Sequence, residues 1–527
     1  MSRSSILIVF VAVLASLLEI IDTSIVNVAL PTMMGSLGAT LEDISMVITG
    51  YAIANAIVLP LSAWMSERIG RRKYYLGCIT AFTLASVACG FAPNLASLTI
   101  FRIIQGFMGG ALLPTSQALI YEQFPKEKAG MAGAIFGMSV MIGPALGPVL
   151  GGYLTDNHGW RSIFNVNLPL GLIALAVGSA VIFDRQKTSE ELARQQSNQH
   201  DSNPGFDGVG LALLVAGIGC LQFVLERGEP DDWFASRAIC SAAFIAATCL
   251  PLFVWWELRV KNPVINIRLF FDPLVTCGVL LMAGLGFFLY GLVFILPVFI
   301  GRMYHYTATQ TGALFIPGSI LTFFMMPFIG KLMQRGTNPK ILIFIGLTSI
   351  ELCIWSLLSF NPQTSRTELL QMLYLRGFAL AFMFVPINSS ILSQFSGATV
   401  GQVAGLLNLC RQLGGSAGIA MIATMLTINA KQNYLDLAAH ISMLEPNTLM
   451  NYFQAAAGSL LKFGRDLGSA TGEDFALRMI AMRLETQAFM MSFLQLVWVM
   501  MFVFSLTYVP LYFLNLRRKT AAVHDAH

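Results

Sequence analysis

The chain has 527 residues, of which 56% are hydrophobic and 11% are charged, with a formal net charge of +4. A soluble globular protein carries about 25% charged residues, so this composition excludes an ordinary water-soluble enzyme, and the small net charge argues against nucleic acid as a partner. We therefore predict an all-α polytopic membrane protein that is built as a transporter and is surrounded by the lipid bilayer.

A membrane-spanning helix needs about 20 predominantly apolar residues. The chain contains fourteen such runs, at 6–30, 44–66, 74–92, 95–120, 130–154, 163–183, 208–226, 236–257, 274–300, 311–333, 340–360, 369–393, 402–428 and 488–514. The first run begins like a signal peptide, but it continues to Leu30, contains Glu19 and Asp22, and lacks a small-residue cleavage site. We interpret it as a retained first span.

Lysine and arginine are distributed unevenly between the segments that connect the predicted spans. With a cytoplasmic N-terminus, nineteen of them fall in inside segments and five in the short outside loops. This positive-inside bias predicts a multi-pass membrane protein with both termini in the cytoplasm.

Two of the connections are long. The polar one before residue 208 is predicted to be a flexible cytoplasmic linker, and the one at 429–487 is predicted to form short amphipathic helices that pack against the transporter or a partner. The predicted organisation is an N-terminal six-helix bundle at 1–184, a linker at 185–207, two inserted helices at 208–257, and a C-terminal six-helix bundle at 258–527 that contains the long periplasmic loop.

Three short matches indicate an internal repeat. They pair Pro60–Arg68 with Pro327–Arg335, Pro31 at the end of the first span with Pro297, and Gly106-Phe107 with Gly377-Phe378, at offsets of 267, 266 and 271 residues. Nearly equal offsets indicate two related bundles, with the substrate site expected near the bilayer midplane between them. The counterpart of Asp22 in the second bundle falls around Leu289 and is not an acid.

Charged side chains at membrane depth are costly, so they are functional candidates. Glu19, Asp22, Thr23 and Asn27 form a polar stripe along the first span. Asp22 is the predicted proton carrier, with Arg102 as its partner, and the alternative is a fixed pair that holds two helices together. Glu19 is a second proton site, a binder of cationic substrate, or an ionised group that faces an aqueous lumen.

Other polar residues within the predicted spans are candidates for lining the substrate cavity: Asn27, Gln105, Glu351, Arg376, Asn388, Asn408 and Arg411. Arg376 and Arg411 either attract anionic groups of a substrate or tether helices to one another. The 38 phenylalanines and 26 methionines would supply adaptable apolar surface for bulky lipophilic compounds.

The loop AWMSERIGRRKYYLG at 63–77 concentrates charge at the predicted cytoplasmic face, with Glu67, Arg68, Gly70, Arg71 and Arg72. The glycine permits a tight turn, and the cations can pair with helix ends and with carboxylates of neighbouring spans. A simple positive-inside anchor would need these charges but not their arrangement.

The fifth span contains GMSVMIGPALGPVLGG at 137–152. Glycines at near-four-residue spacing allow another helix to approach closely, and prolines favour a kink. We predict that this helix seals one face of a gated pathway, and a dimer face is the alternative. The predicted gating residues are Gly143, Pro144, Gly147, Pro148, Gly151 and Gly152.

The sequence contains no phosphate-binding loop and no histidine pair at metal spacing. Its eight cysteines fall in apolar runs without metal-ligand spacing. We expect neither a cofactor nor a metal, and we expect an ion gradient to supply the energy.

These motifs resemble the major facilitator superfamily, specifically its fourteen-span drug:proton antiporters of the EmrB/QacA type. The resemblance covers nearly the whole chain and is carried by Asp22–Pro31 (first-span motif), Ala63–Lys73 (loop motif), Leu98–Ala111 (fourth-span motif implicated in proton transfer), Gly137–Gly152 (antiporter motif) and Trp160–Pro169. The loop motif departs from the family pattern, because Ala63 stands where glycine is usual and Glu67 where aspartate is usual.

The resemblance implies a major facilitator fold of two six-helix bundles plus two inserted helices, and proton-coupled efflux of lipophilic drug-like compounds by alternating access. The 429–487 loop resembles the periplasmic loop of EmrB-like pumps, which implies a tripartite assembly with a periplasmic adaptor and an outer-membrane channel. Two alternatives remain open: a dedicated exporter of one metabolite, such as a fatty acid or siderophore, and a membrane ligand sensor that does not transport.

Overall fold

The computed structural model describes residues 2–182, 207–260, 263–440 and 470–514. Regular secondary structure in these ranges is entirely helical. Twelve helical segments in them are long and apolar enough to cross a membrane, judged by length and composition. Two further predicted spans coincide with α3 (Arg71–Gly90) and α6 (Ala129–His158). The described helices are therefore consistent with fourteen spans.

The first part of the chain forms helices at the positions of the first six predicted spans. Besides α3 and α6, they are α1 (Arg3–Leu37), α2 (Leu41–Ile69), α4 (Leu95–Gly109), α5 (Leu112–Glu122) and α7 (Asn167–Val181). Helices α4 and α5 follow each other closely and together make the fourth span. Pro31 lies inside α1, so the prediction that it ends the first span is wrong. Membrane helices tolerate an internal proline because their surroundings satisfy the freed backbone group.

The predicted inserted helices are α9 (Gly208–Arg227) and α10 (Arg237–Glu257), which pack against each other. All of the predicted linker except Asp207 lies outside the described residues. The later helices are α11 (Pro273–Tyr304), α12 (Ala308–Gln334), α13 (Pro339–Ser356), α14 (Arg366–Leu392), α15 (Ala398–Ala439), α17 (Ala470–Ser505) and α18 (Tyr508–Phe513).

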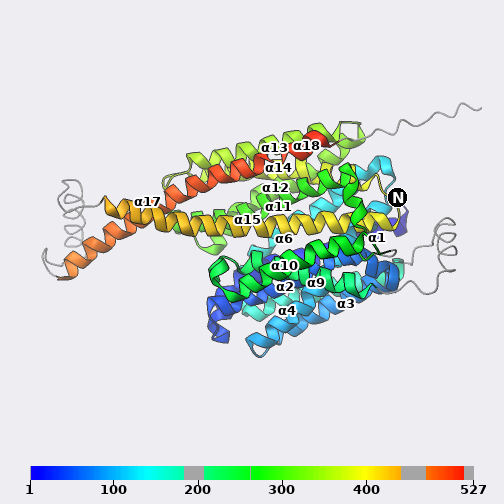
Figure 1. The fold of residues 1–527 in the computed structure, drawn as a ribbon, viewed down its shortest axis with the longest axis horizontal. Coiled ribbons are helices and arrows are strands. Elements are labelled where there is room, and N and C mark those ends of the chain that lie inside the picture. Colours follow the sequence, from blue (N-terminus) through cyan, green and yellow to red (C-terminus); the bar gives the residue numbers. More distant parts are fainter. Residues whose placement is uncertain (1, 183–206, 261–262, 441–469, 515–527) are drawn as a thin grey trace, which may run out of the picture.

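Helices α15 and α17 reach beyond the rest of the molecule at one end, whereas the N-terminus and α18 lie at the opposite end (Figure 1). The separate short helices predicted over 429–487 are wrong for the described part of that segment, because 429–439 continue α15 and 470–487 form the first turns of α17. The helix-forming sequence there extends the neighbouring spans without a break. Residues 441–469 lie outside the described residues.

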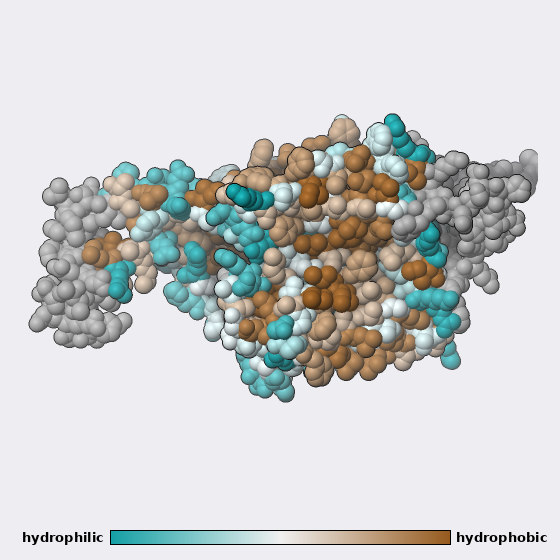
Figure 2. Space-filling view, turned by 60° about the horizontal axis from the view of Figure 1, so that its bottom comes forward, coloured by the Kyte–Doolittle hydropathy of each residue, from teal (hydrophilic) through white to brown (hydrophobic). Residues whose placement is uncertain are grey.

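The outer surface suits a lipid environment. Figure 2 shows hydrophobic side chains over the broad middle of the molecule and hydrophilic ones mainly toward its ends. The exposed large apolar side chains come from many helices and include Leu84, Phe244, Phe324, Trp355 and Phe502. Large exposed apolar surfaces on a folded protein mark contact with a membrane or a partner.

The two predicted bundles contact each other through small residues. A Cβ atom on Gly130 of α6 would lie 2.8 Å from the carbonyl oxygen of Gly330 on α12, so the two backbones touch. A Cβ atom on Gly405 of α15 would likewise lie 2.7 Å from the carbonyl oxygen of Leu59 on α2. These contacts lie near the loops that the charge bias assigns to the cytoplasm. The structure is therefore closed at that end.

Helix α9 hydrogen-bonds to both predicted bundles. Arg227 Nη1 donates to Ser45 Oγ of α2 at 2.6 Å and to the Glu42 carbonyl oxygen at 3.1 Å. In the same last turns of α9, Glu226 Oε1 accepts from Ser416 Oγ of α15 at 2.8 Å, and Gln222 Nε2 donates to Ser416 Oγ at 2.7 Å. The end of α9 thus connects α2 to α15.

Candidate proton-coupling and substrate site

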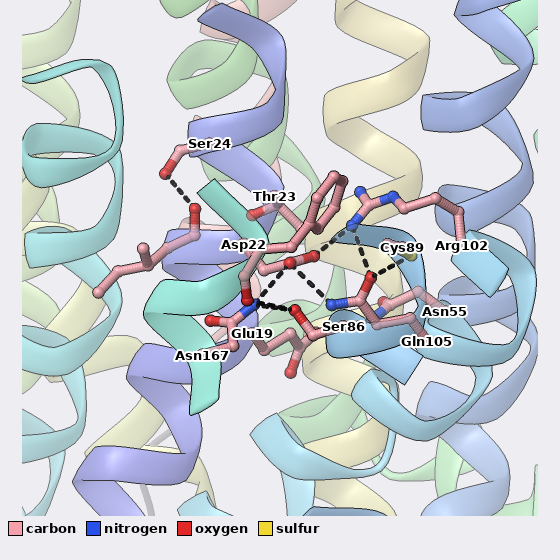
Figure 3. A network of polar contacts seen from close by, with 12 residues as sticks. Glu19, Asp22, Thr23, Ser24, Asn55, Ser86, Cys89, Arg102, Gln105 and Asn167 are labelled. Atoms are coloured by element: carbon pink, nitrogen blue, oxygen red, sulfur yellow. Dashed lines mark hydrogen bonds and ion pairs between the residues drawn. The ribbon is translucent and has the colours of Figure 1, made fainter. Parts of the chain in front are cut away.

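A buried polar network surrounds Asp22 in the middle of α1 (Figure 3). Its Oδ2 accepts a hydrogen bond from Arg102 Nη1 of α4 at 2.5 Å. Its Oδ1 accepts from Gln105 Nε2 of α4 and from Asn167 Nδ2 of α7, both at 2.8 Å. Asp22 is 0% exposed and Arg102 is 1% exposed, so the pair is shielded from solvent. The structure therefore brings together Asp22, Arg102 and Gln105 as one unit.

Helix geometry explains why α4 presents two donors to one carboxylate. Arg102 and Gln105 are three residues apart and share a face of the helix. Arg102 Nη1 also donates to Gln105 Oε1 at 2.9 Å, which orients the glutamine so that its amide nitrogen faces Asp22. The guanidinium lies 4.2 Å from the centre of the Tyr51 ring, a favourable cation–π contact. Asp22 is the acid in direct contact with Arg102.

The sequence did not single out Asn167, although it lies within the quoted Trp160–Pro169 motif. Its Nδ2 also donates to Ser86 Oγ of α3 at 2.9 Å, so the network joins four helices. Tyr51 was missed as well. A neutral polar residue in a predicted span does not by itself indicate a functional site. The free-energy cost of burying it depends on hydrogen-bond partners whose positions the sequence does not give.

Glu19 lies about one turn before Asp22 on α1 and is 3% exposed. Its Oε1 accepts from Asn55 Nδ2 at 2.8 Å, and its Oε2 accepts from the Leu113 backbone nitrogen at 3.2 Å. Arg411 of α15 lies within electrostatic range but not in contact. Glu19 thus has neutral donors where Asp22 has a guanidinium, so the two acids occupy chemically different sites.

The glycines of α6 allow α1 to approach closely at the level of Asp22. A Cβ atom on Gly143 would lie 2.1 Å from Ile20, and one on Gly147 would lie 2.0 Å from Ser24 Oγ. Ser24 Oγ also donates to the Gly143 carbonyl oxygen at 3.0 Å (Figure 3). The remaining predicted gating residues lie on the same helix: Pro144, Pro148, Gly151 and Gly152.

A second polar cluster joins the two predicted bundles. Gln117 Nε2 of α5 donates to Asn388 Oδ1 of α14, and Gln117 Oε1 accepts from Asn408 Nδ2 of α15, each at 2.7 Å. Arg411 Nη2 donates to Asn408 Oδ1 at 3.2 Å. Three of the predicted cavity residues therefore lie together, around a glutamine that the sequence did not single out.

The other predicted cavity residues lie apart from these networks. Asn27 is exposed on α1. Glu351 of α13 is half-buried, and its Oε1 has no hydrogen-bond partner among the described residues. Arg376 of α14 is 6% exposed, and within the same part of the chain it has neither a hydrogen bond nor an ion pair, while its guanidinium lies 5.4 Å from the centre of the Phe315 ring.

The charged loop between α2 and α3 contacts neighbouring helices. Gly70 has a φ of 95°, a conformation that L side chains rarely adopt, and it separates the two helices. Arg71 forms an ion pair with Glu122 at the end of α5, and Arg72 Nη2 donates to the Ser179 carbonyl oxygen of α7 at 2.8 Å. The guanidinium of Arg68 lies over the Trp64 ring. Glu67 lies in the last turn of α2.

The described ranges contain no group of three or more histidine, cysteine, aspartate or glutamate side chains that could bind a metal ion. The fold and this polar interior define a multi-pass helical membrane transporter rather than an enzyme. Residues 12–419 match the family model described as Major Facilitator Superfamily, and the chain belongs to this family.

Relatives and solved structures agree with this assignment. The chain is 32% identical over 441 residues to the multidrug export protein EmrB of Escherichia coli (strain K12), which covers 84% of each chain. It is 34% identical over 430 residues to the fatty acid resistance protein FarB of Neisseria gonorrhoeae, covering 81% of this chain and 82% of the relative. The crystal structure of the human organic anion transporter MFSD10 matches with a TM-score of 0.59 and 17% identity, covering 81% of this chain and 94% of that one, which shows the fold alone.

Proposed function

We propose that this protein is a proton-coupled multidrug efflux transporter of the bacterial inner membrane, with both termini in the cytoplasm. It exports lipophilic toxic compounds by alternating access between two six-helix bundles. Helices α9 and α10 are inserted between these bundles in the sequence. The substrate class follows the similarity to EmrB. The observation that supports proton coupling is the Asp22–Arg102 pair. A buried carboxylate in a membrane helix costs free energy, so such residues are rare and are usually functional.

Proton uptake at Asp22 would change the contact between α1 and α4. A carboxylate accepts from Arg102, Gln105 and Asn167 together, whereas a carboxylic acid has a donor of its own that must replace one of them. Protonation also removes the charge that balances Arg102. Binding and release of a proton therefore favour two different arrangements of these helices.

Helix α6 connects that change to the opposite bundle. Its Gly143 and Gly147 contact α1 next to Asp22, while its Gly130 touches Gly330 of α12 at the closed end. A shift of α1 then displaces a helix that forms part of the closure. This supports the role of the α6 glycines in gating, because larger residues would separate α1 from α6.

Glu19 is the proposed second proton site. Within the described ranges no cation contacts it, and its two hydrogen bonds come from Asn55 and the Leu113 backbone. A protonated Glu19 no longer offsets the charge of Arg411, so the electrostatic field at the bundle interface changes when Glu19 binds a proton.

We further propose that the extension made by α15 and α17 contacts a periplasmic adaptor, which connects the transporter to an outer-membrane channel. The extension lies at the end of the molecule opposite the N-terminus (Figure 1). It consists of long helices that continue membrane spans, and such a rigid projection suits contact with a partner outside the bilayer.

The function is tested by pH-gradient-driven efflux of a fluorescent lipophilic dye from proteoliposomes. We expect gradient-dependent efflux by the wild type, its loss in Asp22→Asn, and a reduced number of protons moved per dye in Glu19→Gln. Asp156→Asn, at an exposed site on α6, is the matched control and should transport normally. Equal gradient-driven efflux by Asp22→Asn and wild type would remove Asp22 from proton coupling.

A second candidate function is the export of a single amphipathic metabolite. One relative, FarB, is named for fatty acid resistance. Arg376 inside α14, which has no hydrogen bond or ion pair in the described part of the chain, also favours a substrate with an anionic group. A growth panel that compares sensitivity to fatty acids with sensitivity to unrelated drugs separates this function from broad efflux.

A further inference from the structure

The two bundles can be compared at a helix crossing that occurs in both. A Cβ atom on Gly106 of α4 would lie 2.4 Å from the Tyr51 carbonyl oxygen of α2. A Cβ atom on Gly377 of α14 would lie 2.3 Å from the Gly318 carbonyl oxygen of α12. These glycines are the pair matched in the internal repeat, and each marks the point where its helix touches a neighbouring backbone. The residue before each glycine therefore occupies an equivalent position.

The equivalent residues differ in charge and in partner. In the first bundle this residue is Gln105, whose amide donates to the carboxylate of Asp22 at 2.8 Å. In the second bundle it is Arg376, and the position corresponding to Asp22 falls around Leu289. The second bundle therefore has a stronger donor for a carboxylate, but no carboxylate in the repeat position.

Among the described residues, none supplies a counter-ion to Arg376. Its side chain forms no hydrogen bond or ion pair with any described residue, and the titratable group that acts on it electrostatically is the Cys353 thiol. Tethering requires a partner on another helix, and the described contact of the guanidinium is with the Phe315 ring. A buried cation without a counter-ion is costly, and a bound anion would offset that cost.

We propose that Arg376 binds the carboxylate of an amphipathic anionic substrate. The planar guanidinium fork matches a carboxylate. The neighbours one turn away on α14 are the buried, apolar Met372, Leu373 and Leu380, so a ligand that reaches Arg376 enters an apolar region. The inference rests on the proposed transport function and narrows its substrate class. Arg411 differs, because it already donates to Asn408 and lies within range of Glu19.

Binding of dodecanoate to the purified protein tests this proposal, measured by calorimetry below the micellar concentration. We expect the wild type to bind it, Arg376→Gln to bind at least about tenfold more weakly, and Arg376→Lys to retain part of the affinity. Arg366→Gln, at an exposed position on the same helix, is the matched control and should bind like the wild type. Equal affinity of Arg376→Gln and wild type would overturn the proposal.

Thermal melting separates an anion site from a helix tether and shows that the variant folds. Without ligand, we expect Arg376→Gln to melt no lower than the wild type, because the unpaired charge is gone. Dodecanoate should then raise the melting temperature of the wild type alone. Loss of stability in the ligand-free variant, together with a preserved dodecanoate effect, would assign a tethering role instead.

Two comparison probes fix the ligand class. Acetate tests for a site that takes any small anion, and dodecyltrimethylammonium tests for a site that responds to the alkyl chain alone. Binding of either as tight as dodecanoate would overturn the amphipathic-anion assignment. Gradient-driven dye efflux by the wild type without dodecanoate binding would refute this inference and leave the proposed function standing, whereas no movement of dye or dodecanoate would refute the proposed function.

Discussion

Replacing Asp22 by asparagine keeps the shape of the side chain but removes its charge and one acceptor. In the protein, Oδ2 accepts from Arg102, while Oδ1 accepts from Gln105 and Asn167. Whichever way the new amide turns, its NH₂ group faces donors: Arg102 in one orientation, the two side-chain amides in the other. Turning Gln105 to compensate would break the bond that it accepts from Arg102.

The larger effect is on Arg102, which is 1% exposed and has Asp22 as its contacting acid. Removing one partner of a buried ion pair costs about 3–5 kcal/mol, because the other charge stays buried without compensation. We expect Asp22→Asn to lower the free energy of unfolding by this amount. The double variant Asp22→Asn/Arg102→Met should recover part of the loss, since it leaves no isolated charge.

Equilibrium unfolding of the purified protein in detergent measures these differences. Asp156→Asn serves as the control, because substitutions at exposed sites usually change stability by less than about 0.5 kcal/mol. An Asp22→Asn variant as stable as the wild type, or a double variant less stable than the single one, would contradict this expectation. Either result would mean that Arg102 does not depend on Asp22 for compensation.

Two further predictions address movement of the helices. Gly147→Ala places a Cβ atom 2.0 Å from Ser24 Oγ and 2.5 Å from Ser24 Cβ, so α1 must move away from α6. We expect this variant to reduce dye efflux at least tenfold. Gly77→Ala is the control and should leave efflux unchanged, because no atom lies within 4 Å of the added Cβ. Cysteines at Ala63 and Gly401 would have Cβ atoms about 3.4 Å apart, close to disulfide geometry. Oxidation should stop efflux by locking the closed end and reduction should restore it, and efflux by the oxidised, cross-linked protein would contradict alternating access.

The sequence predicts well those features that come from the cost of charge in a membrane. Asp22 and Arg102 stand out because a charged side chain in an apolar run is costly and is usually functional. The structure brings the two residues into contact. The family match confirms the membrane-transporter class that composition and hydropathy indicate.

What the sequence could not predict depends on which helices are neighbours. Asn167 and Asn55 contact the two acids from other helices, and hydropathy does not indicate such pairs. Helix ends are also uncertain, because continuing a helix through Pro31 depends on packing by other helices. For Arg376 the sequence left two roles open, and the choice between them requires knowing that none of the described acids is in contact with it.

The position of α9 has a consequence for the transport cycle. Rotating one bundle against the other must stretch either the bonds of Arg227 to α2 or those of Glu226 and Gln222 to Ser416. The bonds to α15 include a carboxylate acceptor and are charge-assisted as well, but α9 packs more extensively against α2 than against α15. Helices α9 and α10 should therefore move together with the first bundle and slide along α15 during transport. Distances between spin labels test this: the α9–α2 distance should stay constant during the transport cycle while the α9–α15 distance varies. The reverse pattern would show that α9 and α10 move with the second bundle.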